Sequence, residues 1–146
     1  MKVVLQRVKN ASVTVEEEET GAINNGLLLL IGIHEKDTEE LVRWICNKIL
    51  NLRVFDDEEG KMNYSVKDIE GDLLLVSQFT LYGDARKGNR PSYVQAAGPE
   101  KAERLYNRMI DYLKRNADLK VETGRFGAHM NVALCNDGPV TIILEK

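Results

Sequence analysis

Apolar and polar positions alternate over the first part of the chain, a pattern that is typical of half-buried β-strands. Apolar residues recur over 3–8 and again over 13–15, and the stretch "NAS" between them predicts a hairpin with its turn at 10–12. A short strand is expected over 21–23, and the apolar run over 27–33 predicts a further one. The chain therefore begins with closely spaced strands.

Two later segments carry apolar residues at helical spacing. The first follows "HEKD", where Asp37 and Glu40 have the spacing of a capping box at a helix start. Its apolar face comprises Leu41, Val42, Ile45, Cys46, Ile49 and Leu50. The second helix is expected to begin near Gly98-Pro99, because proline suits the first helical position. Its apolar face comprises Ala102, Leu105, Tyr106, Met109, Ile110 and Leu113.

The rest of the chain favours strands. The run "DLLLVSQFTL" over 72–81 is continuously apolar before it turns polar, which predicts a buried strand. Further strands are expected over 120–124, 129–135 and 141–144. This order of elements predicts an α+β fold, with a curved, barrel-like, mainly antiparallel β-sheet and two amphipathic helices packed outside. We expect a single domain over 1–146, since no linker or repeat interrupts the pattern.

Composition and charge limit the classes of function. Of the 146 residues, 43% are hydrophobic and 29% are charged, which indicates a globular protein and excludes a disordered one. The net charge of −3 argues against a dedicated nucleic-acid coat protein. A local exception is the loop 84–90, which contains Arg86, Lys87 and Arg90. This loop is either simply solvated or makes a few contacts to phosphates.

The sequence lacks the familiar signatures of enzymes. His34 and His129 each stand alone, so no metal site is expected. Neither a nucleophile elbow, a Walker loop nor a dinucleotide fingerprint occurs, and we expect no cofactor. Cys46 and Cys135 sit among apolar neighbours and are expected to be buried thiols. No apolar run is long enough to span a membrane and no signal peptide is recognisable, so we expect a cytoplasmic protein.

Three stretches remain as candidates for chemistry. The stretch "SQFTLYG" at 77–83 is either a strand leaving the core or a site that offers backbone N–H groups and the Thr80 hydroxyl to a reacting carbonyl. The stretch "GRFGAHM" at 124–130 is either a bulge or a tight bend that presents an aromatic ring. The stretch "NDGPV" at 136–140 is either a turn before the last strand or a rigid backbone surface held against a ligand.

Taken together, "SQFTL" at 77–81 and "NDGPVT" at 136–141 closely resemble the paired signature of the D-aminoacyl-tRNA deacylases. "MKVVLQRVKNASVTV" at the start, "RPSY" at 90–93 and "GRFGAHM" are similar to the same family, so the resemblance covers essentially the whole chain. It implies a homodimer with active sites at the subunit interface. The implied substrate is the ester that joins a D-amino acid to the terminal adenosine at the acceptor end of tRNA.

The resemblance also implies roles for individual residues. Gly138 and Pro139 would form a cis peptide that reaches into the partner subunit's active site, where two fixed carbonyls exclude the side chain of an L-amino acid. Glycine has hydrogen on both sides of its α-carbon, so glycyl-tRNA is predicted to be cleaved as well. Phe79 and Thr80 are the expected catalytic residues, through backbone N–H groups, in a reaction assisted by the adjacent ribose hydroxyl. The other candidates are Ser77 and Gln78 for the terminal adenosine, Phe126 and Met130 for the substrate side, and Arg86, Lys87 and Arg90 for phosphates of the acceptor stem.

Three other functions stay open at this point. The chain could be a non-catalytic module that binds the RNA end, because no general base or activated nucleophile is evident. It could be a general esterase that uses the Thr80 hydroxyl. It could also be a structural homodimer in which the Gly-Pro stretch is only an interface contact.

Overall fold

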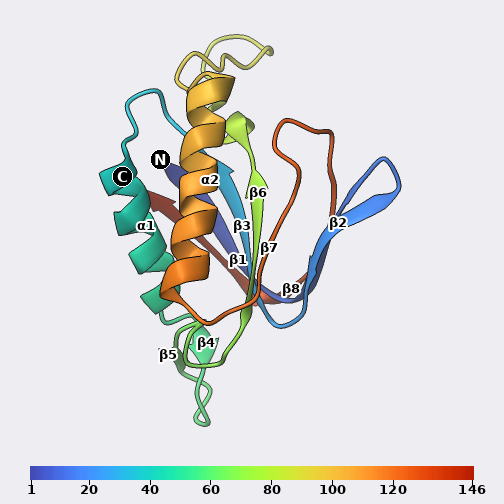
Figure 1. Cartoon of the computed structure of the whole chain (residues 1–146), viewed down its shortest axis with the longest axis vertical. Coiled ribbons are helices and arrows are strands. Elements are labelled where there is room, and N and C mark those ends of the chain that lie inside the picture. The colour runs from blue at the N-terminus through green and yellow to red at the C-terminus, as the bar shows by residue number, and fades with distance from the viewer.

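Two helices cover one face of a strongly curved β-sheet (Figure 1). The computed structural model describes all of residues 1–146. The elements are β1 (Lys2–Val15), β2 (Glu18–Ile23), β3 (Gly26–Gly32), α1 (Glu39–Asn51), β4 (Phe55–Asp56), β5 (Met62–Tyr64), β6 (Asp72–Ser77), the short 3-10 helix η1 (Phe79–Tyr82), α2 (Pro99–Asn116), β7 (Val121–Thr123) and β8 (Asn131–Glu145). Neither α1 nor α2 is long and apolar enough to cross a membrane.

The strands of the main sheet follow the order β2-β1-β3-β6-β7, and β8 pairs with β1. The pairs of β1 with β2, β3 and β8 are antiparallel, whereas β3, β6 and β7 run parallel. The sheet nearly closes between β2 and β7, where the Lys120 ammonium donates to the Ala22 carbonyl oxygen over 2.7 Å. The expected α+β fold with a barrel-like sheet is confirmed, and the sheet is mixed.

The predicted hairpin at 10–12 is wrong. Strand β1 runs without interruption from Lys2 to Val15, and the chain reverses only at Glu16 and Glu17, which have positive φ angles of 49° and 69°. The break in alternation that suggested a turn is a change of register beside Asn10. Because β8 continues to pair with β1 on both sides of this irregularity, the strand bends there instead of ending.

The stretch 136–140 does not reverse the chain either. Strand β8 pairs with β1 on both sides of it, with Asn136 opposite Val8 and Thr141 opposite Gln6. Residues 137–140 therefore face a single residue of β1, Arg7, and form an extended bulge on an edge strand. An edge bulge accommodates proline because no ladder hydrogen bond is needed from its nitrogen.

The start of α1 also differs from expectation. Thr38 is the N-cap, and its hydroxyl accepts from the Leu41 backbone N–H over 3.3 Å. The Asp37 carboxylate is used elsewhere: it accepts from the Met1 ammonium over 2.7 Å and from the His34 backbone N–H over 2.8 Å. The predicted capping box of Asp37 is therefore wrong. Helix α2 begins at Pro99 as predicted, with Gly98 as its N-cap.

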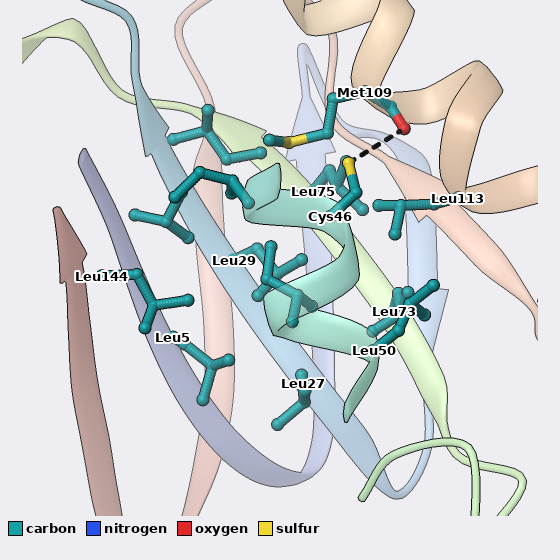
Figure 2. Packing of buried hydrophobic residues seen from close by; sticks show 14 of the residues in the cluster. Leu5, Leu27, Leu29, Cys46, Leu50, Leu73, Leu75, Met109, Leu113 and Leu144 are labelled. Carbon is teal, nitrogen blue, oxygen red and sulfur yellow. Dashed lines mark hydrogen bonds between the residues drawn. The ribbon is translucent and has the colours of Figure 1, made fainter. Parts of the chain in front are cut away.

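The main core lies between the helices and the sheet (Figure 2). Strands β3 and β6 are buried on both faces: Leu29 and Leu75 face the helices, while Leu28 and Leu74 face a second cluster inside the curl of the sheet. Burial raises the pKa of the Cys46 thiol to about 12, so this thiol stays protonated near neutral pH.

Cys135, by contrast, is exposed, and the prediction that it is buried is wrong. It lies on β8, which has β1 as its only strand partner and therefore forms an edge of the sheet. An edge strand leaves apolar side chains in contact with solvent unless another element covers them.

Candidate active site

A pocket of about 560 Å³ opens at the carboxyl ends of the parallel strands β3 and β6. Because β3 and β6 run parallel, their carboxyl ends lie at the same edge, and the connections there can surround a ligand. Here the connections are η1, the start of α2 and the loop from β7 to β8, which rises beside the end of β6 (Figure 1). The lining residues are Ile31, Ile33, Val76, Ser77, Gln78, Phe79, Tyr93, Ala96, Ala97, Pro99, Ala102, Phe126, Gly127, Ala128, His129, Met130 and Val132.

The structure brings together five of the residues that the sequence singled out, since Ser77, Gln78, Phe79, Phe126 and Met130 all line the pocket. Strand β6 delivers the first of them at the point where it leaves the core, and the loop before β8 delivers the last two. Residues that are about 50 positions apart in the sequence therefore line the same pocket.

Thr80 lies in η1 but is not among the residues that line the pocket. Its hydroxyl oxygen accepts a hydrogen bond from the side-chain amide of Gln78. The first N–H groups of a helix, here those of Phe79 and Thr80, have no partner within the helix. No side chain caps this end of η1, so the N–H groups are available to an oxygen placed before them.

Aromatic rings frame the pocket. Phe79 is 57% exposed, and its ring meets that of Tyr93 edge to face with centroids 5.1 Å apart. Phe126 packs against the buried ring of Tyr106, with centroids 5.8 Å apart. The Tyr106 hydroxyl donates to the Leu75 carbonyl oxygen over 2.8 Å, which ties α2 to β6 just before the pocket.

Gly138 and Pro139 lie in the exposed bulge of β8 and do not line this pocket. The peptide bond between them is cis, as the resemblance implied. Gly138 has a φ of +125°, and a Cβ at this position would lie 2.9 Å from a Val140 methyl group and 3.1 Å from a guanidinium nitrogen of Arg7. Gly138 is therefore required by the local backbone and by its neighbours.

The side chain of Arg7, on the neighbouring strand β1, supports the bulge at 137–140. It is 6% exposed, and its Nε donates to the Asp137 carbonyl oxygen over 3.1 Å. Its Nη1 donates to the Val54 carbonyl oxygen over 2.9 Å, and the guanidinium lies 3.2 Å from the Asp56 carboxylate and 3.3 Å from that of Asp137. Arg7 thus connects the bulge to the segment that follows α1.

Polar side chains of β8 and β1 also stabilise the bulge through hydrogen bonds. The amide oxygen of Asn136 accepts from the Val140 backbone N–H over 3.0 Å, and its amide nitrogen donates to the Thr141 hydroxyl over 3.2 Å. The Gln6 amide donates to the same hydroxyl over 3.3 Å. These contacts leave the backbone of Gly138 and Pro139 exposed on a well-supported loop.

The basic loop lies apart from the pocket. Arg86 is bound to Asp84 through two guanidinium hydrogen bonds of 2.9 and 2.6 Å, and the pair lowers the pKa of the Asp84 carboxyl to about 2. Lys87 and Arg90 are exposed and form no ion pair. Of the three predicted phosphate-binding residues, these two are free to meet an anion.

Sequence reasoning missed several residues around the pocket and the bulge. Arg7 follows Val3 and Leu5 on the buried face of β1, and a charge in phase with buried apolar positions was a signal for a buried polar contact. His129 lines the pocket, although its isolation in the sequence suggested a structural role. Tyr93 and Ala96 reach the pocket only through tertiary folding. No group of three or more His, Cys, Asp or Glu side chains converges to hold a metal ion.

The profile of a known family, D-Tyr-tRNA(Tyr) deacylase, matches residues 4–145. Among curated proteins, the D-aminoacyl-tRNA deacylase of Exiguobacterium sp. is 60% identical over 146 residues, which cover 100% of this chain and 99% of the relative. The D-aminoacyl-tRNA deacylase of Thermotoga petrophila is 57% identical and covers 100% of this chain, with 97% of its own length aligned.

Two solved structures share the fold. A c-Myc DNA unwinding element binding protein superposes with a TM-score of 0.95 at 46% identity, covering 100% of this chain and 99% of its own. A probable eukaryotic D-amino acid tRNA deacylase superposes with a TM-score of 0.84, covering 98% and 97% of the two chains. At 19% identity the second likeness shows the fold alone.

Proposed function

The chain belongs to the D-Tyr-tRNA(Tyr) deacylase family and is a D-aminoacyl-tRNA deacylase, an ester hydrolase; from this premise we propose that it acts as a homodimer in which Gly138 and Pro139 of one subunit complete the pocket of the other. One observation carries this proposal. Within a single chain the two halves of the family signature are apart, because the pocket is lined by 77–79 whereas the Gly138-Pro139 bulge is exposed and lies outside it.

The surface of β8 supports the dimer. This edge strand exposes Leu134 and Ile143, by 40% and 63%, on either side of the bulge. Exposed apolar side chains on an edge strand favour association with another chain. A two-fold symmetric contact along β8 would carry each bulge toward the other subunit and would complete two sites at once.

The completed pocket would select substrates by steric exclusion. D- and L-amino acids differ at the α-carbon by an exchange of hydrogen and side chain. If the amino group and the ester carbonyl are both held, a backbone wall on one side admits hydrogen and rejects every side chain. Discrimination by pocket fit alone reaches about 10–200-fold per methylene group. Sparing correct L-aminoacyl-tRNA needs discrimination of about 10⁴-fold, or roughly 5.5 kcal/mol, which rigid exclusion can supply.

The reaction needs little help from side chains. Water adds to the ester carbonyl carbon, and the backbone N–H groups of Phe79 and Thr80 stabilise the negative charge that develops on the carbonyl oxygen. The bond to the 3′-oxygen of the terminal ribose then breaks, and that oxygen takes up a proton. The neighbouring ribose 2′-hydroxyl can relay the proton, so the RNA itself assists. Stacking of the terminal adenine needs only aromatic and apolar surface, which fits a pocket flanked by Phe79.

The deciding experiment follows the decay of three esters, D-Tyr-tRNA, L-Tyr-tRNA and Gly-tRNA, with catalytic amounts of protein. Rapid loss of the D-tyrosyl and glycyl esters, with the L-tyrosyl ester spared, is the expected result. Equal rates for the D- and L-tyrosyl esters would contradict exclusion by the bulge. Decay no faster than in buffer would leave a binding module that recognises the RNA end.

A cytoplasmic location, where aminoacyl-tRNA is consumed, remains our expectation.

The first prediction concerns the Thr80 hydroxyl. In Thr80→Ala we expect kcat for D-Tyr-tRNA to fall by less than about tenfold, since one neutral hydrogen bond is worth roughly 1 kcal/mol. The protein would keep its backbone N–H at this position. Single-turnover rates measured beside a filter-binding assay separate chemistry from binding. Complete loss of turnover with intact binding would instead identify Thr80 as a nucleophile.

The second prediction concerns the free cations of the basic loop. A plot of log K for tRNA binding against log salt concentration has a negative slope. In the double variant Lys87→Ala/Arg90→Ala, the magnitude of this slope should be smaller by about 1.5, since each phosphate contact contributes roughly 0.7–0.9 to it. Arg86→Ala is the matched control, and it should change the slope less because Asp84 already engages that guanidinium. An unchanged slope in the double variant would place the acceptor stem elsewhere on the surface.

A further inference from the structure

The loop that carries Phe126 and Met130 begins at Gly124, directly after β7. The Gly124 backbone N–H donates to the Leu75 carbonyl oxygen over 2.9 Å, and this oxygen also accepts from the Tyr106 hydroxyl over 2.8 Å. Gly124 is thus fixed beside β6, just before the pocket. Its φ lies outside the left-handed region, so the backbone itself does not demand glycine.

What demands glycine here is a single neighbour. A Cβ on Gly124 would lie 2.5 Å from the Met130 sulfur, far inside van der Waals contact. The next neighbours, a Val13 methyl group at 3.5 Å and the Leu75 carbonyl oxygen at 3.9 Å, would be ordinary contacts. An added methyl group would therefore fit the fold and conflict only with the Met130 thioether.

Met130 faces two environments. One side of it packs against the cluster inside the curl of the sheet, which contains Val13, Leu74 and Val76. The other side lines the pocket. Because the cluster is closely packed, a displaced thioether is blocked on that side and has free space on the side of the pocket.

We propose that Gly124 is a positioning residue for the pocket: by having no side chain, it leaves the space in which the Met130 thioether lies and so keeps the pocket open. The inference rests on the proposed function only in taking this pocket as the site for the ester. An alanine at 124 would move the thioether into the pocket and narrow it. The effect of one methyl group on an apolar pocket is typically about 10–200-fold in kcat/KM.

The placement of Met130 can be tested without any substrate. The chain has four methionines, so labelling their methyl groups with ¹³C gives few resonances. The Met130 resonance is identified by its loss in Met130→Ala. In Gly124→Ala we expect the Met130 resonance to shift strongly while those of Met62 and Met109 stay in place. An unmoved Met130 resonance would overturn the inference, whatever the protein hydrolyses.

The consequence for catalysis is tested with D-Tyr-tRNA. Gly124→Ala should lower kcat/KM by about 10-fold or more, mainly through a higher KM, because the N–H groups of η1 are untouched. Adding Met130→Ala to this variant should restore kcat/KM to the level of Met130→Ala alone, since the thioether is then gone. A general loss of folding would not be rescued in this way.

Gly98→Ala is the matched control. Gly98 has a φ of −59°, and nothing lies within 4 Å of an added Cβ, so activity should be unchanged. Full activity in Gly124→Ala, or a double variant as slow as Gly124→Ala, would contradict the proposal. If the wild-type protein failed to hydrolyse D-Tyr-tRNA, the proposed function would fail, while the methyl resonances would still decide the role of Gly124.

Discussion

Replacing Arg7 with alanine is expected to reduce kcat/KM for D-Tyr-tRNA by about 100-fold, because a displacement of roughly 1 Å in a positioning element costs this much. Arg7 is the one side chain that joins the bulge of β8, through the Asp137 carbonyl, to the segment after α1, through the Val54 carbonyl. Without Arg7 the bulge loses its link to this segment, and the Asp137 and Val54 carbonyl oxygens lose a charged hydrogen-bond donor.

Stability should fall as well, by roughly 2–3 kcal/mol, since hydrogen bonds to a charged group contribute about 1.5–3 kcal/mol. The carboxylates of Asp56 and Asp137 are partly exposed, so water can solvate them again after the loss, which keeps the cost moderate. Thermal unfolding measured beside the kinetics separates the two effects, provided that activity is assayed well below the lowered Tm.

Two further variants make this prediction sharp. Lys9→Ala removes another cation near Asp137, but that pair is 3.9 Å apart and exposed, so little change is expected. Arg7→Lys keeps the charge but cannot reach two carbonyls at once, and it should lie between wild type and Arg7→Ala. If Arg7→Ala kept full activity with unchanged sparing of L-Tyr-tRNA, the bulge could not be the selecting element.

The parts of the fold that local pattern could predict are those whose contacts are close in sequence. The apolar stripes of α1 and α2 follow from helical spacing, and the observed buried faces include Val42, Ile45, Leu105 and Met109. The apolar run at 72–76 correctly indicated a buried strand, although the strand ends at Ser77 and Phe79–Tyr82 form η1 instead of the continuation predicted to residue 81. For such elements the pattern and the tertiary environment agree.

The errors arise where a distant strand decides the local structure. The segment 10–12 resembles a turn, yet β8 pairs across it and keeps β1 extended. The same pairing turns 136–140 from an apparent reversal into a bulge. Asp37 failed as a capping residue because the chain terminus supplies it with a stronger, charged partner. None of these contacts leaves a local signature, since each joins residues that are far apart along the chain.

The candidate site divides in the same way. The strand end at 77–79 could be identified because a buried strand that turns polar is visible in the sequence. The position of Met130 beside Gly124 and the contact of Arg7 with the bulge could be identified only from the three-dimensional structure. The proposed contact of the bulge with the pocket of a second chain comes from the family resemblance and has no counterpart in the local pattern of the sequence.

Gly138→Ala addresses that question and should nearly abolish activity. With a φ of +125° an L-residue is strained by about 1–3 kcal/mol, and its Cβ would also press on Val140 and on the guanidinium of Arg7. The bulge must therefore move, and we expect kcat/KM for D-Tyr-tRNA to fall by at least about 100-fold. Gly60→Ala is the control: its φ of +76° is also positive, but nothing lies within 4 Å of an added Cβ, and activity should persist.

Mixing two inactive variants then tests whether the bulge acts across the subunit interface. Phe79→Pro removes one proposed N–H donor at the first position of η1, where proline is tolerated. In a dimer of Gly138→Ala with Phe79→Pro, one site carries both defects and the other carries neither. After the two proteins are unfolded together and refolded in equal amounts, about a quarter of all sites should be intact by two-fold symmetry, and activity should return to that fraction of wild type. If each pocket used the bulge of its own chain, every site would remain defective and no activity would return.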